Sequence, residues 1–117
     1  NYSKPPENID VLLNFIQKLD VKNAEGLLNE NPNVANEKMD DGLEPIFFCI
    51  RNKSNKCFKI LLEKMDFDEE LIKKVYIEIK KTGTPKMLKY FLDHFKIDYN
   101  DPCLNEKDKE MLSQLNK

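Results

Sequence analysis

Residues 41–50 read DGLEPIFFCI and, after a short polar turn, residues 57–62 read CFKILL. Gly42 supplies the backbone freedom that a tight turn needs. Pro45 stands where proline is well tolerated, in the first turn of a helix. The stretch therefore predicts a turn followed by a pair of helices, the first from Pro45 to Asn52 and the second over residues 55–64.

A similar helix pair is predicted immediately before this one. Residues 9–16 carry apolar side chains at helical spacing, which predicts a helix over residues 7–18. Asp20 is suited to cap a second helix, which the Asn31-Pro32 step would end. Four pairs of side chains in the two helix pairs are separated by 34 positions, namely Ile16 and Ile50, Ala24 and Phe58, Leu27 and Leu61, and Leu28 and Leu62. A fixed period of this length indicates a repeat architecture.

A third, less regular unit follows. Residues 71–79 and 87–92 each form an apolar face at helical spacing, and the turn between them is residues 82–85. This unit lacks the Asp-Gly-x-x-Pro sequence that opens the second unit. Its first helix is therefore expected to reach back to Asp68. The turn-containing loop that precedes a helix pair, which we call the finger, is expected to be shortened or absent here. Beyond it, the apolar residues Met111, Leu112 and Leu115 predict one terminal helix.

These motifs resemble the ankyrin repeat family over residues 9–100, most strongly from Met39 to Lys64. The resemblance implies an all-α fold, an ankyrin-like α-solenoid of about three helix-turn-helix repeats plus a C-terminal capping helix. It implies one domain over residues 1–117, with repeat one at 7–38, repeat two at 39–66, repeat three at 67–100 and the C-terminal helix at 105–116. The chain is expected to be a fragment of a larger protein.

The chain departs from the family pattern at several positions of the second unit. Glu44 stands in place of the family's threonine, Phe47 in place of its histidine, Cys49-Ile50 in place of its pair of small residues, and Lys53 in place of its turn glycine. Burying a phenylalanine contributes roughly 1.5–3 kcal/mol, whereas a net hydrogen bond contributes about 1 kcal/mol. A stack of this type is therefore expected to survive the exchange at Phe47.

The resemblance also implies where a partner would bind, because ankyrin proteins usually contact partners through finger tips and the first helix of each pair. The implied finger residues are Asp40, Asp41 and Leu43, and the implied helix residues are Gln17, Lys18, Arg51, Asn52, Lys80 and Lys81. Four of these cations, Lys18, Arg51, Lys80 and Lys81, would form a positive ladder suited to an acidic peptide or surface. Alternatively they are ordinary solvated charges on helix faces. Phe48, beside the ladder, is expected to be either an exposed anchor or part of the core.

Composition narrows the class of function. The net charge of −2 and the single arginine disfavour nucleic acid as the main partner. The sequence contains neither an apolar run of about 18 residues, as a membrane span requires, nor a secretion signal. Three widely spaced cysteines do not form a disulfide framework, which favours a reducing cytoplasmic or nuclear compartment.

Metal and catalytic sites are poorly supported. Cys49, Cys57, Cys103 and His94 lack the short ligand spacing of zinc sites. An EF-hand loop starting at Asp98 would need glycine and glutamate at its sixth and twelfth positions, where Cys103 and Lys109 stand. A Cys-His dyad has no visible orienting group, and a phosphate-binding glycine loop is missing. The sequence predicts neither enzymatic activity nor a cofactor.

We therefore expect a monomeric protein–protein interaction module. One alternative is a structural or regulatory helical domain that packs permanently against other parts of its own protein. A second, less favoured alternative is a nucleic-acid contact through the lysine ladder, which salt-dependent binding would reveal.

Overall fold

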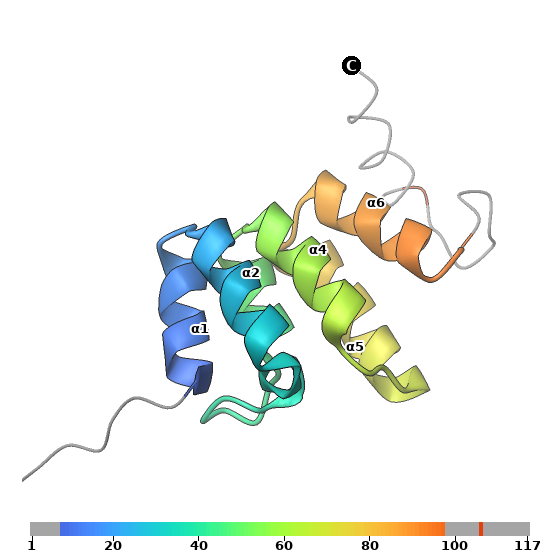
Figure 1. The fold of residues 1–117 in the computed structure, drawn as a ribbon. Coiled ribbons are helices and arrows are strands. Elements are labelled where there is room, and N and C mark those ends of the chain that lie inside the picture. The colour runs from blue at the N-terminus through green and yellow to red at the C-terminus, as the bar shows by residue number, and fades with distance from the viewer. Residues whose placement is uncertain (1–7, 98–105, 107–117) are drawn as a thin grey trace, which may run out of the picture.

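The computed structural model describes residues 8–97 and residue 106. Over these residues the fold is all-α, as expected, and contains no strand. Its elements are α1 (Asn8–Gln17), α2 (Val21–Glu30), the 3₁₀ helix η1 (Pro32–Asn36), α3 (Pro45–Arg51), α4 (Asn55–Lys64), α5 (Glu69–Thr82) and α6 (Pro85–His94) (Figure 1). The terminal helix expected at 105–116, residue 7 and residues 98–100 of the third unit lie outside the described residues, apart from Glu106.

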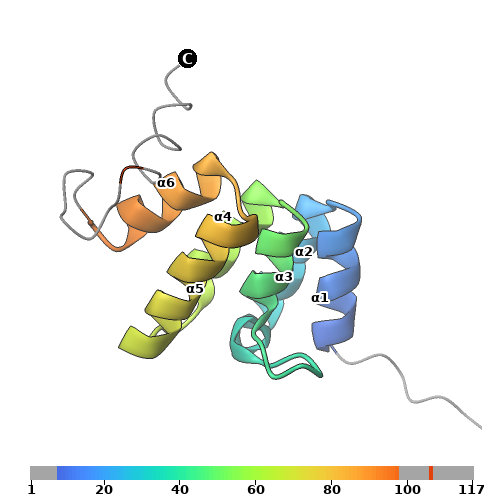
Figure 2. The same cartoon turned by 180° about the vertical axis from the view of Figure 1, so that it is seen from behind.

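The helices form two rows. In the first row α1 contacts α3 and α3 contacts α5, while in the second row α2 contacts α4 and α4 contacts α6. Each first-row helix also packs against the second-row helix that follows it in the chain. Figure 1 shows the second row in front, and Figure 2 shows the opposite side of the molecule, with α3 and α5 of the first row in front. Successive helix pairs therefore lie side by side.

Equivalent residues of the successive helix pairs meet in one continuous core. The first-row helices place Ile16, Ile50 and Ile79 in this core without any exposed surface. The second-row helices contribute Leu28, Leu62 and Leu92, which are equally buried. Most helices thus bury one apolar stripe, whereas in α3 every side chain from Pro45 to Ile50 is buried or half-buried.

The turn that joins a first-row to a second-row helix is the same in the first two pairs. Leu19 and Lys53 adopt φ values of 58° and 56°, in the left-handed region. In each turn the same two backbone hydrogen bonds form, Leu19 N to Ile16 O and Asp20 N to Phe15 O in the first, Lys53 N to Ile50 O and Ser54 N to Cys49 O in the second. This is the Schellman arrangement, which glycine usually completes. Lys53 therefore adopts a conformation that is typical of glycine at this position of a turn.

The third pair is joined differently. Asp68 caps α5 by accepting a hydrogen bond from Leu71 N, and Thr84 caps α6 by accepting one from Met87 N. Gly83 between them has an ordinary φ of −84°, but a Cβ atom there would lie 2.8 Å from the carbonyl oxygen of Ile79. Glycine is needed here because the chain passes close to the end of α5.

The two connections between pairs differ in length. In the first, residues 32–36 form η1, which buries Val34 and Ala35, and the finger follows. It turns at Gly42, whose φ is 84°, and Met39 N donates to Leu43 O at 2.7 Å. Between α4 and α5 only residues 65–68 intervene, which agrees with the expected loss of a finger there.

Candidate interaction surface

The finger residues that the sequence singled out differ in exposure. Asp40 and Asp41 are exposed, whereas Leu43 is half-buried and packs against the core. Asp41 Oδ1 accepts a hydrogen bond from Leu43 N at 3.0 Å, which holds the tip of the finger in shape. Asp41 thus has a role within the chain, whereas Asp40 has no hydrogen-bond or ion-pair partner among the described residues.

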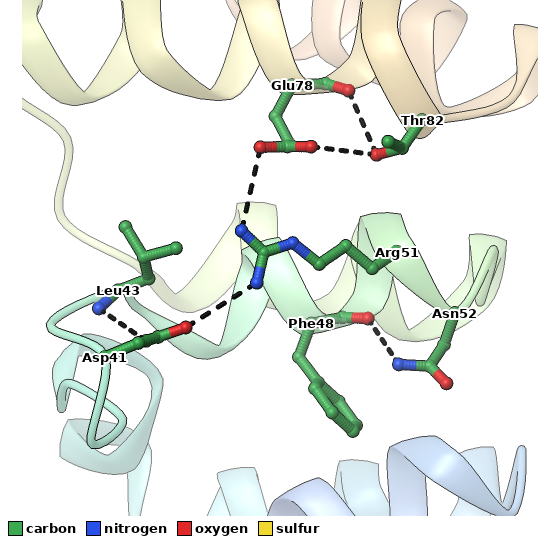
Figure 3. A network of polar contacts seen from close by, with 7 residues as sticks. All are labelled: Asp41, Leu43, Phe48, Arg51, Asn52, Glu78 and Thr82. Atoms are coloured by element: carbon green, nitrogen blue, oxygen red, sulfur yellow. Dashed lines mark hydrogen bonds and ion pairs between the residues drawn. The ribbon is translucent and has the colours of Figure 1, made fainter.

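Arg51 connects the finger to the next helix pair. Its guanidinium lies 3.5 Å from Asp41 and 3.9 Å from Glu78 of α5. Glu78 also accepts a hydrogen bond from the Thr82 hydroxyl at 2.9 Å (Figure 3). Exposed ion pairs contribute roughly 0–1 kcal/mol each. The network therefore adds little to overall stability, but it directs the Arg51 side chain and partly neutralises its charge.

Phe48 in α3 and Asn52, the residue after the helix, stand one turn apart and next to Arg51. Asn52 Nδ2 donates to the Phe48 carbonyl oxygen at 2.8 Å, and the Phe48 ring points away from Arg51 (Figure 3). The ring is half-buried, so Phe48 is neither a fully exposed anchor nor a fully buried core residue. It packs against the core and still presents part of its surface to solvent.

The three lysines of the expected ladder lie at the ends of first-row helices. Lys18 follows α1 and is exposed, and Lys81 is exposed in the last turn of α5. Lys80 is half-buried, with its ammonium 4.8 Å from the centre of the Tyr76 ring. Together with Phe48, Arg51, Asn52 and Ile77 these lysines define what we call the first-row face.

Sequence reasoning missed Ile77, which is 51% exposed on α5. Its position was recognisable, because it follows Phe48 by 29 residues, the same offset that separates Ile50 from Ile79. Phe48 and Ile77 thus occupy equivalent positions on neighbouring helices. The first-row face therefore combines apolar and cationic side chains.

The two described cysteines are unsuited to nucleophilic chemistry. Burial raises the pKa of the Cys49 thiol well above its ordinary value. Burial also raises the pKa of Cys57, against the opposing effect of a hydrogen bond with Ser54. Both thiols are free and stay protonated at neutral pH. Within residues 8–97 and residue 106, no group of three or more potential ligands from His, Cys, Asp and Glu is placed to hold a metal ion.

A groove of about 320 Å³ runs between α4 and α6 in the second row. Lys59 lies over the Tyr90 ring at 5.3 Å, and Lys89 pairs with Asp93 at 2.9 Å. Lys89 is thus paired with a carboxylate of its own helix, and Lys59 lies against an aromatic ring. Mixed charges of this kind specify no ligand class.

Comparison with protein-family models, curated proteins and solved structures finds no match for this chain. Over the described part of the chain, every helix is too short or too polar to cross a membrane.

Proposed function

We propose that this chain is an ankyrin-like stack that acts as a protein–protein interaction module, binding through the finger and the first-row face. The supporting observation is the recurrence of one turn geometry and one set of buried side chains at a 34-residue interval. A repeated, rigid scaffold with side chains displayed along one face suits recognition by surface complementarity. Such binding needs neither a cofactor nor a catalytic group.

The charges on this face favour an acidic partner. Arg51 is shared between Asp41 and Glu78, so the cations best placed to meet a partner are the exposed Lys18 and Lys81, with the half-buried Lys80 beside Lys81. Charge complementarity of this kind guides orientation and association rate more than it adds affinity. The free thiols of Cys49 and Cys57 favour action in a reducing compartment, the cytoplasm or nucleus.

Selection of short random peptides on the immobilised chain tests the proposal. Binding of the enriched peptides is then compared for the wild type and a Lys18→Glu/Lys80→Glu/Lys81→Glu variant by fluorescence anisotropy. We expect the variant to bind roughly tenfold more weakly, a loss of about 1.4 kcal/mol. Arg51 is left intact because a glutamate there would add a third carboxylate to Asp41 and Glu78.

A matched control carries the same change in net charge on the second row. Lys22, Lys56 and Lys86 are exposed on α2, α4 and α6, and a triple Lys→Glu variant at these positions should keep wild-type affinity. Circular dichroism melting curves verify that both variants remain folded. Equal weakening in the two variants, or no peptide bound at all, would contradict the proposed binding face.

Permanent packing against another part of the same polypeptide is the second candidate. Leu19, 60% exposed at the turn after α1, favours it because a large apolar side chain in water is suited to burial. Sedimentation velocity separates the two functions. A reversible binding module stays monomeric as concentration rises, whereas a chain that lacks its packing partner self-associates.

A further inference from the structure

Ile77 lies at the centre of a set of lysines. On a helix the nearest surface neighbours of a residue stand three and four positions away. For Ile77 all four of these neighbours are lysines, namely Lys73, Lys74, Lys80 and Lys81. We call Ile77 and these four residues the α5 patch. It presents one half-exposed apolar side chain framed by cations.

The lysines of the α5 patch have different partners within the chain. Lys73 pairs with Glu69 at 3.5 Å and Lys74 pairs with Glu70 at 3.3 Å, both on the exposed side of α5. Exposed pairs of this kind contribute only about 0.3–0.5 kcal/mol, so a partner's carboxylate can compete for these lysines at little cost. Lys81 forms no ion pair with any described residue.

Ile77 itself does little for the fold. β-branched residues are weaker helix formers than alanine or leucine, and half of this side chain remains in water. Phe48 occupies the equivalent position on α3, which lies beside α5 (Figure 2). Apolar side chains thus recur at equivalent, partly exposed positions of two neighbouring first-row helices.

We propose that the α5 patch, together with Phe48, binds an acidic segment of a partner protein that carries an apolar side chain between carboxylates. This inference rests on the proposed function and specifies the chemistry of the partner. The apolar side chain covers Ile77, and the flanking carboxylates lie near Lys81 and its neighbouring lysines. Apolar contact at the centre of a site with polar contacts around it is the usual organisation of a binding hot spot.

The charges along α5 favour such a segment over an anionic membrane. Glu69 and Glu70 occupy the first turn of the helix and Lys80 and Lys81 the last. A flat anionic surface that approached Ile77 would meet both ends of the helix and be repelled by the two glutamates. A peptide can place its carboxylates over the cationic half alone.

The test uses the peptides enriched on the whole chain. Enriched sequences should contain apolar residues flanked by Asp or Glu. Ile77→Gln removes the apolar contact while retaining a good helix former, and Lys81→Glu reverses a cation at the edge of the patch. Each should weaken binding of an enriched peptide by about tenfold. Leu19→Gln is the matched control, because Leu19 is the other large apolar side chain that is strongly exposed among the described residues, and it should leave binding unchanged.

The outcomes distinguish this inference from the proposed function. Suppose that the triple lysine variant Lys18→Glu/Lys80→Glu/Lys81→Glu loses binding while Ile77→Gln keeps it. The first-row face then binds the peptide, but Ile77 does not provide the apolar contact, and the inference about the α5 patch is overturned. If no peptide binds, both proposals fail. Co-sedimentation with phosphatidylserine-containing vesicles completes the test, and vesicle binding that Ile77→Gln abolishes would overturn the assignment to a protein segment.

Discussion

Arg51 Nη1 lies 3.5 Å from Asp41 Oδ2, so an ion pair joins the tip of the finger to the end of α3. The other side of the same guanidinium faces Glu78 of α5 at 3.9 Å. One side chain thus connects the finger and two successive first-row helices. Arg51, which the ankyrin resemblance implies for partner binding, therefore has a structural role within the chain.

This arrangement predicts a small, salt-sensitive coupling between Arg51 and Asp41. In a double-mutant cycle with Arg51→Met and Asp41→Asn, we expect a coupling free energy of about 0.2–1 kcal/mol, because both side chains are about half exposed. Asparagine keeps the acceptor for Leu43 N, so the finger turn is preserved. Urea unfolding at low and at molar salt measures the coupling. A value that persists unchanged at molar salt would contradict a solvent-exposed ion pair.

Two adjacent phenylalanines should respond very differently to truncation. Phe47 is 3% exposed, and Phe47→Ala should destabilise the fold by about 3–5 kcal/mol through loss of buried surface and formation of a cavity. Phe48 is half-buried, so Phe48→Ala should cost clearly less and instead weaken peptide binding. Urea denaturation of both variants provides the comparison. Equal destabilisation would mean that the ring of Phe48 belongs to the core.

Two glycines are expected to show effects of opposite sign on replacement by alanine. Gly26 lies inside α2, and a Cβ atom added there would meet only open space, so Gly26→Ala should stabilise the fold by roughly 0.5–1 kcal/mol. At Gly83 the added carbon would meet the backbone of Ile79 at 2.8 Å, and such overpacking costs about 1–3 kcal/mol. Thermal melts of the two variants should therefore shift in opposite directions. A stabilised Gly83→Ala variant would show that the turn after α5 is wider than the structure indicates.

The helix boundaries were predictable because local signals coincide with them. Asp20, Asp68 and Thr84 provide capping side chains, and Pro45 stands at the first position of its helix. Such interactions reach only a few residues along the chain, so a single sequence reveals them. The expected helices 7–18 and 45–52 each extend only one residue beyond the observed ends, 17 and 51.

The properties of the surface were less predictable because they depend on contacts between distant residues. The ankyrin resemblance implied Arg51 as a binding cation, with an ordinary solvated charge as the alternative, whereas its pairing with Glu78, 27 positions further along, follows from the packing of α3 against α5. The 3₁₀ turn at Val34 and Ala35 depends likewise on burial against neighbouring helices. Periodicity identifies which face of a helix is polar, but not which polar groups meet across two helices.

Alkaline pH is expected to destabilise the fold through its buried thiols. The pKa values of Cys49 and Cys57 are raised in the folded state, first by burial, so the folded state holds these protons more tightly than the unfolded state. The associated stability is complete below the ordinary thiol pKa of 9.0 and is lost as pH rises above it. The maximal slope is about 1.4 kcal/mol per pH unit for each thiol. A Cys49→Ala/Cys57→Ala variant should show a shallower loss of unfolding free energy above pH 9, and an identical slope would contradict this origin.

Leu19 and Lys53 share one left-handed turn conformation, which favours glycine at both positions. We expect glycine to stabilise the fold more at the first turn than at the second. A non-glycine residue in this region costs roughly 1–2 kcal/mol, and the greater flexibility of glycine in the unfolded chain offsets about 0.4–1 kcal/mol of any gain. Leu19→Gly should therefore raise the unfolding free energy modestly, because the exposed leucine makes few contacts that would be lost. Lys53→Gly should gain less, since Lys53 Nζ donates to the Thr82 carbonyl oxygen at 2.9 Å and ties the turn to the end of α5. Chemical denaturation of both variants measures the difference, with Lys53→Met as the control that removes only this bond. Equal gains at the two turns would show that the contact with Thr82 adds nothing to stability.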